Sequence, residues 1–258
     1  MPDPFPPDPP NPDELYVGYL PVPAGHRRFL RHIVPAALAI IAGTAIIWSH
    51  THADPGSGRW HDSSKVKLRG TLYAHPYPMI ATTDHRGKTQ MTLLVESGKR
   101  GAAEHAALLD RHAVVAAGTL LERDGPRMLE LSEGASSISP DSSNSTAVDA
   151  ELRASDGQVT LRGEIVDSKC FLGAMKPGNG KTHKACATLC IRGGIPPALA
   201  VQEDNGGVTF YLLAAPDGGP VGEWIEPMVA DSVELTGRLE QRGDLSILRI
   251  APENAHRL

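Results

Sequence analysis

The chain has 258 residues, of which 41% are hydrophobic, 21% charged and 5% aromatic, and its 22 prolines and 26 glycines are too few for a collagen-like or wholly disordered protein. A chain of this length can bury a core in one or two domains. The net charge of −5 lacks the electrostatic attraction that supplies most nucleic-acid affinity, so we expect no nucleic-acid partner.

The N-terminal region predicts a tail followed by a membrane anchor. Residues 1–28 hold nine of the prolines, and we expect them to form an extended, Pro-rich cytoplasmic tail without a core of its own. Residues 29–48 contain an apolar run that begins at Ile33 and is interrupted only by Thr44. This segment has about the 20 residues needed to cross a bilayer and is predicted as a transmembrane anchor.

The charges beside this segment predict its orientation. Arg27, Arg28 and Arg31 favour a cytoplasmic N-terminus, with a juxtamembrane segment at 49–64. In a bacterial cell the chain would then cross the inner membrane once and place its C-terminal part in the periplasm, or more generally outside the cytoplasm. A cleaved export signal is the alternative, which the long polar tail and the weak cleavage site at residues 51–53 disfavour.

Behind the anchor the sequence repeats itself. Each copy begins with a strand that carries Leu-Arg-Gly and continues with three further strand patterns bounded by Gly and Asp turns. The predicted strands are residues 65–73, 91–95, 112–123 and 128–131 in the first copy and 158–166, 208–213, 232–242 and 245–250 in the second. A helical segment, residues 102–109, is expected in the first copy only.

The short strands and the glycines within them predict a mainly β protein with two small closed barrels. The pattern resembles bacterial OB-fold domains of the secreted kind, which implies tandem OB-like domains at 65–133 and 156–252, joined by a flexible Ser-rich linker at 134–155. A pair of β-sandwich modules is the alternative. OB barrels often bind oligonucleotides through a basic, aromatic face, which this chain lacks.

The second copy carries an insertion with all three cysteines. Gly70 and Gly118 are 48 residues apart, whereas the corresponding Gly163 and Gly237 are 74 apart. The additional residues lie at about 168–197, and they hold Cys170, Cys186 and Cys190. The barrel itself therefore does not require the cysteines.

The spacing within the insertion predicts a Cys/His site. Residues 183–192 have helical composition, which places Cys186 and Cys190 on one helix face with His183 in reach. Together with Cys170, these side chains are suited to a tetrahedral Cys₃His site for zinc or copper. The equally weighted alternative is a disulfide of Cys170 with one of the helical cysteines, which leaves one reactive or free thiol. Simple packing of buried thiols is a third possibility.

The sequence also offers three cations near the cysteines and argues against nucleotide and haem as ligands. Lys181, Lys184 and Arg192 are candidates for stabilising a thiolate or an anion. Nucleotide binding is not expected, because Met175 stands where a phosphate-binding loop needs Gly. Covalent haem is not expected either, because no Cys-x-x-Cys-His pattern occurs.

The function predicted from the sequence is that of an accessory protein. No Gly-x-Ser-x-Gly or His-Glu-x-x-His motif occurs, so an enzyme is the less favoured class. Residues 166–197 resemble a stretch of uncharacterised, membrane-anchored bacterial proteins regarded as accessories to respiratory or oxidoreductase systems. The resemblance implies a membrane complex as partner and a redox or metal role. A thiol enzyme with one low-pKa cysteine and a non-catalytic, disulfide-stapled assembly subunit remain alternatives.

Overall fold

The computed structural model describes residues 22–51, 56–132, 137–143, 147–155 and 157–258. The chain divides into two compact units, residues 1–54 and 55–258. Residues 1–21 of the predicted Pro-rich tail lie outside the described residues.

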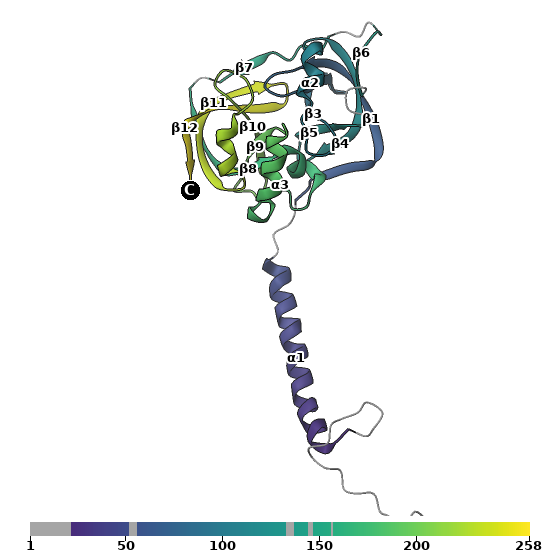
Figure 1. Ribbon diagram of the computed structural model, residues 1–258, viewed down its shortest axis with the longest axis vertical. Coiled ribbons are helices and arrows are strands. Elements are labelled where there is room, and N and C mark those ends of the chain that lie inside the picture. The colour runs from purple at the N-terminus through teal and green to yellow at the C-terminus, as the bar shows by residue number, and fades with distance from the viewer. Residues whose placement is uncertain (1–21, 52–55, 133–136, 144–146, 156) are drawn as a thin grey trace, which may run out of the picture. The chain divides into compact units, whose positions relative to one another are not determined.

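The first unit contains the helix α1 (Ala24–Thr51) (Figure 1). Among the described residues, it is the one helix long and apolar enough to cross a membrane, with a mean hydropathy of 1.8 over its most apolar window. The hydroxyls of Thr44 and Thr51 donate to backbone carbonyls of the preceding turn, which satisfies them without water. The helix is longer than the predicted 29–48, and it suits either a membrane anchor or a signal sequence.

The first half of the second unit is a closed five-stranded barrel. Its strands are β1 (Arg59–Tyr73), β2 (Met79–Thr83), β3 (Thr89–Val95), β4 (Ala113–Glu122) and β5 (Arg127–Leu131). They pair in the order β1-β2-β3-β5-β4, with β3 and β5 parallel, and β1 also pairs with β4 and closes the sheet. The short helices α2 (Ala103–Ala106) and η1 (Ala107–Leu109) precede β4, as predicted for this copy.

The second half repeats this topology. Its barrel strands are β8 (Val159–Asp167), β9 (Pro197–Gln202), β10 (Val208–Ala214), β11 (Ser232–Arg242) and β12 (Leu245–Arg257). They pair in the order β8-β9-β10-β12-β11, with β10 and β12 parallel, and the pairing of β8 with β11 closes the sheet. The helix η5 (Glu223–Met228) precedes β11 at the place that α2 takes in the first barrel, so the prediction of a helix there in the first copy only is wrong.

The first strand of each barrel has a glycine at the equivalent position. A Cβ atom on Gly70 would lie 1.9 Å from the carbonyl oxygen of Ala81, and one on Gly163 would lie 2.4 Å from that of Ala200. Both distances are shorter than atoms can pack, so a side chain would push the second strand away. The prediction of two OB-like barrels is thus confirmed, and the β-sandwich alternative is wrong because each sheet closes on itself.

Other parts of the second unit differ from the sequence-based expectation. β2 and β9 were not foreseen, and β12 continues beyond the predicted boundary at 252. The expected linker contributes β6 (Ile138–Pro140), which pairs with β4, and β7 (Leu152–Ala154), which pairs with β11. Ile138 is buried, and this apolar side chain holds β6 on the first barrel.

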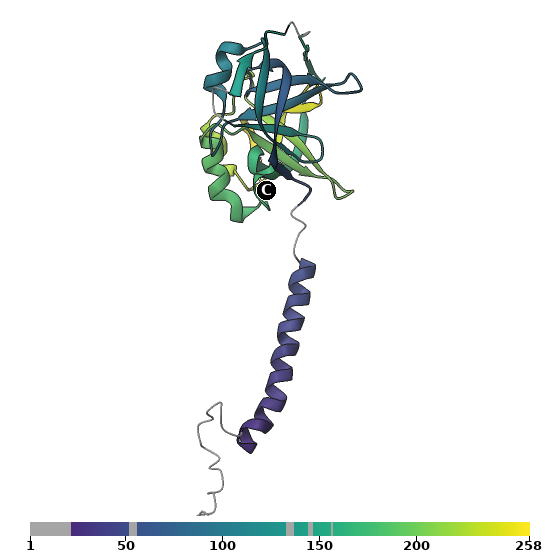
Figure 2. The same cartoon turned by 90° about the vertical axis from the view of Figure 1, so that its right-hand side faces the viewer.

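The two barrels pack against each other through a shared core. One cluster of buried residues fills each barrel, and a further cluster joins side chains of both, including Met79 and Leu93 from the first and Phe210 from the second. Across the same boundary, Arg242 donates from Nη1 to the carbonyl of His75 over 2.7 Å. Figure 2 shows α2 and the helix α3 (Lys184–Arg192), which lies in the cysteine insertion, on the same side of the paired barrels.

Candidate metal and thiol site

The cysteine insertion connects β8 to β9 and folds into three short helical elements. They are η3 (Cys170–Ala174), a single π-helical turn, η4 (Lys181–His183) and α3 (Lys184–Arg192). The π turn is held by the Met175 N–H, which donates to the Cys170 carbonyl over 3.3 Å. Such turns are frequent at functional sites. The helix α3 agrees with the helix predicted over 183–192. Ala187 and Cys190 lie on its buried face, and Cys186 lies at the edge of that face.

These elements bring the predicted ligands together. The ligand atoms of Cys170, His183 and Cys186 all lie within 4.8 Å of one another. Zn–S bonds of about 2.3 Å and Zn–N bonds of about 2.0–2.1 Å place two ligands of one ion within such a separation. The residues therefore have the spacing of a metal site.

The arrangement is not a single four-residue cluster. Cys190 belongs to a second group, in which its sulfur, the sulfur of Cys170 and a carboxylate oxygen of Asp167 also lie within 4.8 Å of one another. Cys170 is shared by both groups, and its side chain and that of Cys190 are buried in the core between the barrels. The insertion thus holds two overlapping ligand triads.

Asp167, the last residue of β8, fixes two members of these triads. Its Oδ1 accepts a hydrogen bond from the Cys170 backbone N–H over 2.8 Å, and its Oδ2 lies 3.0 Å from Nε2 of His183. The carboxylate is fully buried and the imidazole nearly so. A carboxylate on one ring nitrogen of a ligating His sets the tautomer and leaves the other nitrogen for the ion.

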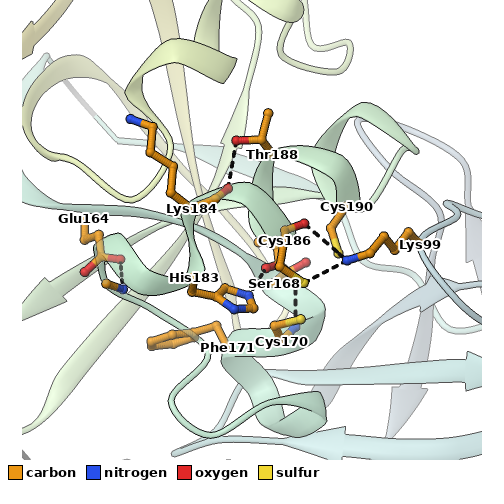
Figure 3. A network of polar contacts seen from close by, with 12 residues as sticks. Lys99, Glu164, Ser168, Cys170, Phe171, His183, Lys184, Cys186, Thr188 and Cys190 are labelled. Carbon is orange, nitrogen blue, oxygen red and sulfur yellow. Dashed lines mark hydrogen bonds and ion pairs between the residues drawn. The ribbon is translucent and has the colours of Figure 1, made fainter.

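The first barrel supplies a lysine to the site of the second. Lys99, in the loop after β3, places its Nζ 2.8 Å from Sγ of Cys186 and 3.4 Å from Sγ of Cys190, and it also contacts the carbonyl of Cys186 (Figure 3). The loop reaches the end of α3 because Gly193 has no side chain. A Cβ there would lie 1.8 Å from the Lys99 carbonyl oxygen.

These contacts shift the pKa values of Cys170 and Cys190 in opposite directions. A hydrogen bond to Cys190, together with burial, raises the pKa of Cys170, so Cys170 keeps its proton and donates it. That hydrogen bond, with help from Lys99, lowers the pKa of Cys190 to about 7. Hydrogen bonding to Cys186, the larger cause, raises the pKa of Lys99, which stays a cation.

The cations named from the sequence pair elsewhere. Lys181 and Lys184 contact the two carboxylate oxygens of Asp231 over 2.9 and 3.0 Å. Arg192 forms an ion pair with Glu226. These three residues belong to the insertion but pair with carboxylates, whereas Lys99 contacts the sulfurs of Cys186 and Cys190.

Sequence reasoning missed two residues of this site. Lys99 is far away in the chain and in the other copy, so no spacing could connect it to the cysteines. Asp167 had a usable signal, because a carboxylate three residues before Cys170, at the end of a strand, is placed to accept that residue's N–H.

All three cysteines are free thiols in the structure, so neither helical cysteine is bridged to Cys170. Comparison of the sequence with protein-family models and with curated proteins gives no match in either case.

Proposed function

We propose that this protein is a membrane-anchored accessory protein that binds one thiophilic metal ion outside the cytoplasm. The observation that carries the proposal is the triad of Cys170, His183 and Cys186, whose ligand atoms lie within 4.8 Å of one another. Two sulfurs and an imidazole select zinc or monovalent copper over hard cations such as magnesium.

The two triads suggest how an ion would be held. Cys170, His183 and Cys186 supply three ligands, which is a sufficient set for monovalent copper. Zinc needs a fourth, and Cys190 is the nearest further thiol, because it shares a 4.8 Å group with Cys170. Asp167 would then not bind the ion but would hydrogen-bond to His183 and orient its ring.

The proposed location rests on α1 and the charges before it. Arg27, Arg28 and Arg31 precede the apolar part of the helix, and such charges are kept on the cytoplasmic side. The residues after α1 would then lie outside the cytoplasm. A metal site tethered there is suited to serve a membrane oxidoreductase, in agreement with the resemblance of residues 166–197 to accessory proteins of such systems.

A thiol enzyme is supported less well. Cys190 has the lowered pKa that a nucleophile needs, but its side chain is only 2% exposed. A substrate approaching from solvent would meet Cys186 first, and the ammonium of Lys99 covers that sulfur.

Metal content tests the proposed site. The full-length chain, purified in detergent under reducing, anaerobic conditions, should bind one equivalent of zinc or monovalent copper, measured by elemental analysis. Cys170→Ser and His183→Gln should each weaken binding at least 10-fold, because each removes a ligand, whereas His112→Ala should bind as the parent does. The His112 ring hydrogen-bonds to the carbonyl of Asp110, and His112 lies in neither ligand triad.

Cobalt substitution adds a spectroscopic test that does not depend on the stability of the variants. Cobalt(II) bound by Cys170 and Cys186 should give sulfur-to-metal charge-transfer absorption in the unaltered protein. Absence of these bands, together with unchanged metal binding in both ligand variants, would rule out the proposed site.

The location has its own experiment. Alkaline phosphatase, which is active only after export, should be active when fused after Leu258 and inactive when fused before Met1. The reverse result would place the site in the cytoplasm and remove the extracytoplasmic part of the proposal.

A further inference from the structure

We propose that Lys99 and Cys186 form a reversible oxidative cross-link, in which one oxygen atom joins Nζ to Sγ. This modification site lies beyond metal binding and needs no ion. It is carried by the separation of the two atoms, by their access to solvent and by the contacts that hold Lys99 in place.

The separation is short for a hydrogen bond to sulfur. Nζ of Lys99 lies 2.8 Å from Sγ of Cys186, which is at or below the usual length of about 2.9–3.0 Å for an N–H···O bond. Sulfur is larger than oxygen, so an N–H···S bond is normally longer still. The two atoms are thus near enough to be bridged by a single atom.

The choice of cysteine follows from distance and exposure. Cys190 is farther from Nζ, at 3.4 Å, and only 2% exposed, whereas Cys186 is half-buried and Lys99 is exposed (Figure 3). A small oxidant can therefore reach the pair of Lys99 and Cys186 from solvent.

The backbone holds Lys99 against α3. The Gly101 N–H donates to the carbonyl of Gly193 over 2.8 Å, and Nζ of Lys99 also lies 3.3 Å from the Cys186 carbonyl. The buried Lys169 donates to the carbonyls of Glu96 and Gly98, just before Lys99. Little chain entropy remains to be lost when the cross-link forms.

The reaction balances with dioxygen as the oxidant. The Lys99 ammonium first gives one proton to solvent. The thiol, the resulting amine and one O₂ then give the S–O–N bridge and one water. The O–O bond breaks, an S–O bond and an O–N bond form, and the thiol hydrogen and one amine hydrogen leave in the water. Sulfur and nitrogen each lose two electrons, and these four electrons reduce both oxygen atoms of O₂. Two equivalents of a dithiol return these electrons and restore the thiol, the amine and one water.

The consequence for metal binding rests on the proposed function. A bridged Cys186 can no longer offer a thiolate, so the triad with Cys170 and His183 loses one ligand. Oxidation would then release the ion, and a dithiol would restore the site.

Peptide mass spectrometry tests the cross-link directly. The metal-free, full-length protein is reduced, freed of reductant and kept in air-saturated buffer, then digested with trypsin. We expect residues 89–100, uncleaved after Lys99, joined to residues 185–192. The product should have the summed mass of both peptides plus one oxygen and minus two hydrogens, and dithiothreitol should separate them.

Three variants locate the bridge. Lys99→Arg keeps the charge but should abolish the product, as should Cys186→Ser, whereas Cys190→Ser should retain it. Lys184 serves as an internal control, since it is the first residue of the same helix but pairs with Asp231 and should be cleaved normally.

Other products overturn the inference. A disulfide among the cysteines with normal cleavage at Lys99, unmodified thiols, or a cross-link without the additional oxygen would each contradict it. Because the metal-free protein is used, the two proposals fail separately. A cross-link in a protein that binds no metal removes only the proposed function, and metal binding without a cross-link removes only this inference.

Discussion

At the scale of single residues, the site depends on how Asp167 uses its two oxygens. One accepts the backbone N–H of Cys170 and so fixes the position of that cysteine, and the other faces Nε2 of His183. When Nε2 carries the proton, Nδ1 of His183 has a free lone pair for an ion. A buried carboxylate thus prepares two ligands at once.

Asp167→Asn should weaken metal binding about 10- to 100-fold with little loss of folding stability. The amide oxygen can still accept the Cys170 N–H, but the amide NH₂ would donate to Nε2 and move the ring proton to Nδ1. Competition with a chelating indicator measures the affinity. Glu164→Gln is the matched control, because Glu164 accepts the Gly180 N–H in the same insertion and lies in neither ligand triad. Equal affinity of Asp167→Asn and the parent would contradict the assigned role.

The ligand residues were largely predictable, and their surroundings were not. The i, i+4 spacing of Cys186 and Cys190 and the preceding His183 determine which side chains a helix brings together. The approach of Lys99 depends on the packing of one barrel on the other, which a single sequence does not encode in any local pattern. Lys181 and Lys184 show the same limit, because their carboxylate partner, Asp231, is distant in the chain.

At the scale of elements, Asp231 fastens the insertion to the second barrel. Its carboxylate contacts Lys181 in η4, Lys184 in α3 and Arg257 at the end of β12. The hydrogen bonds from the two lysines hold the pKa of Asp231 below its ordinary value. Strand spacing and glycines sufficed to predict the barrels, but β2 and β9 were missed because neither shows a clear alternation of polar and apolar residues.

Asp231→Asn should lower the free energy of unfolding at pH 7 by about 1 kcal/mol, or about 2–4 °C in Tm. Because folding lowers the pKa of this carboxyl, its stabilising effect is complete above the unfolded-state pKa of about 3.9 and is lost as the pH falls through the lower folded-state value. Thermal unfolding at pH 7 and pH 3 should therefore show a difference from the parent that shrinks at pH 3. Asp204→Asn, in the exposed turn after β9, is the control. A difference independent of pH would argue against the ion pairs.

At the scale of the whole barrel pair, Lys169 joins the two halves. It lies beside Cys170 in the second copy, is 5% exposed, and donates to the carbonyls of Glu96 and Gly98 in the first. Its Nζ also lies 3.0 Å from a carboxylate oxygen of Glu130 on β5. Buried charges are stable only when paired, so this ion pair ties the cysteine insertion to the first barrel.

Lys169→Met should lower the free energy of unfolding by about 3–5 kcal/mol, because it leaves the Glu130 carboxylate buried without its cation. Adding Glu130→Gln should recover part of this loss, which a double-mutant cycle of denaturant unfolding would measure. Lys181→Met, at a side chain that is 80% exposed, should cost less than about 1 kcal/mol. If the double variant is no more stable than Lys169→Met alone, the ion pair does not account for the loss.

The exchange of lysines between the barrels has a consequence for removing one of them. Lys99 of the first copy covers sulfurs of the second, and Lys169 of the second neutralises an acid of the first. Each barrel thus contributes a cation to the other, and the two also share a cluster of buried side chains. We therefore expect that deleting the copy without cysteines would expose the thiols and the inner apolar surface of the copy that has them.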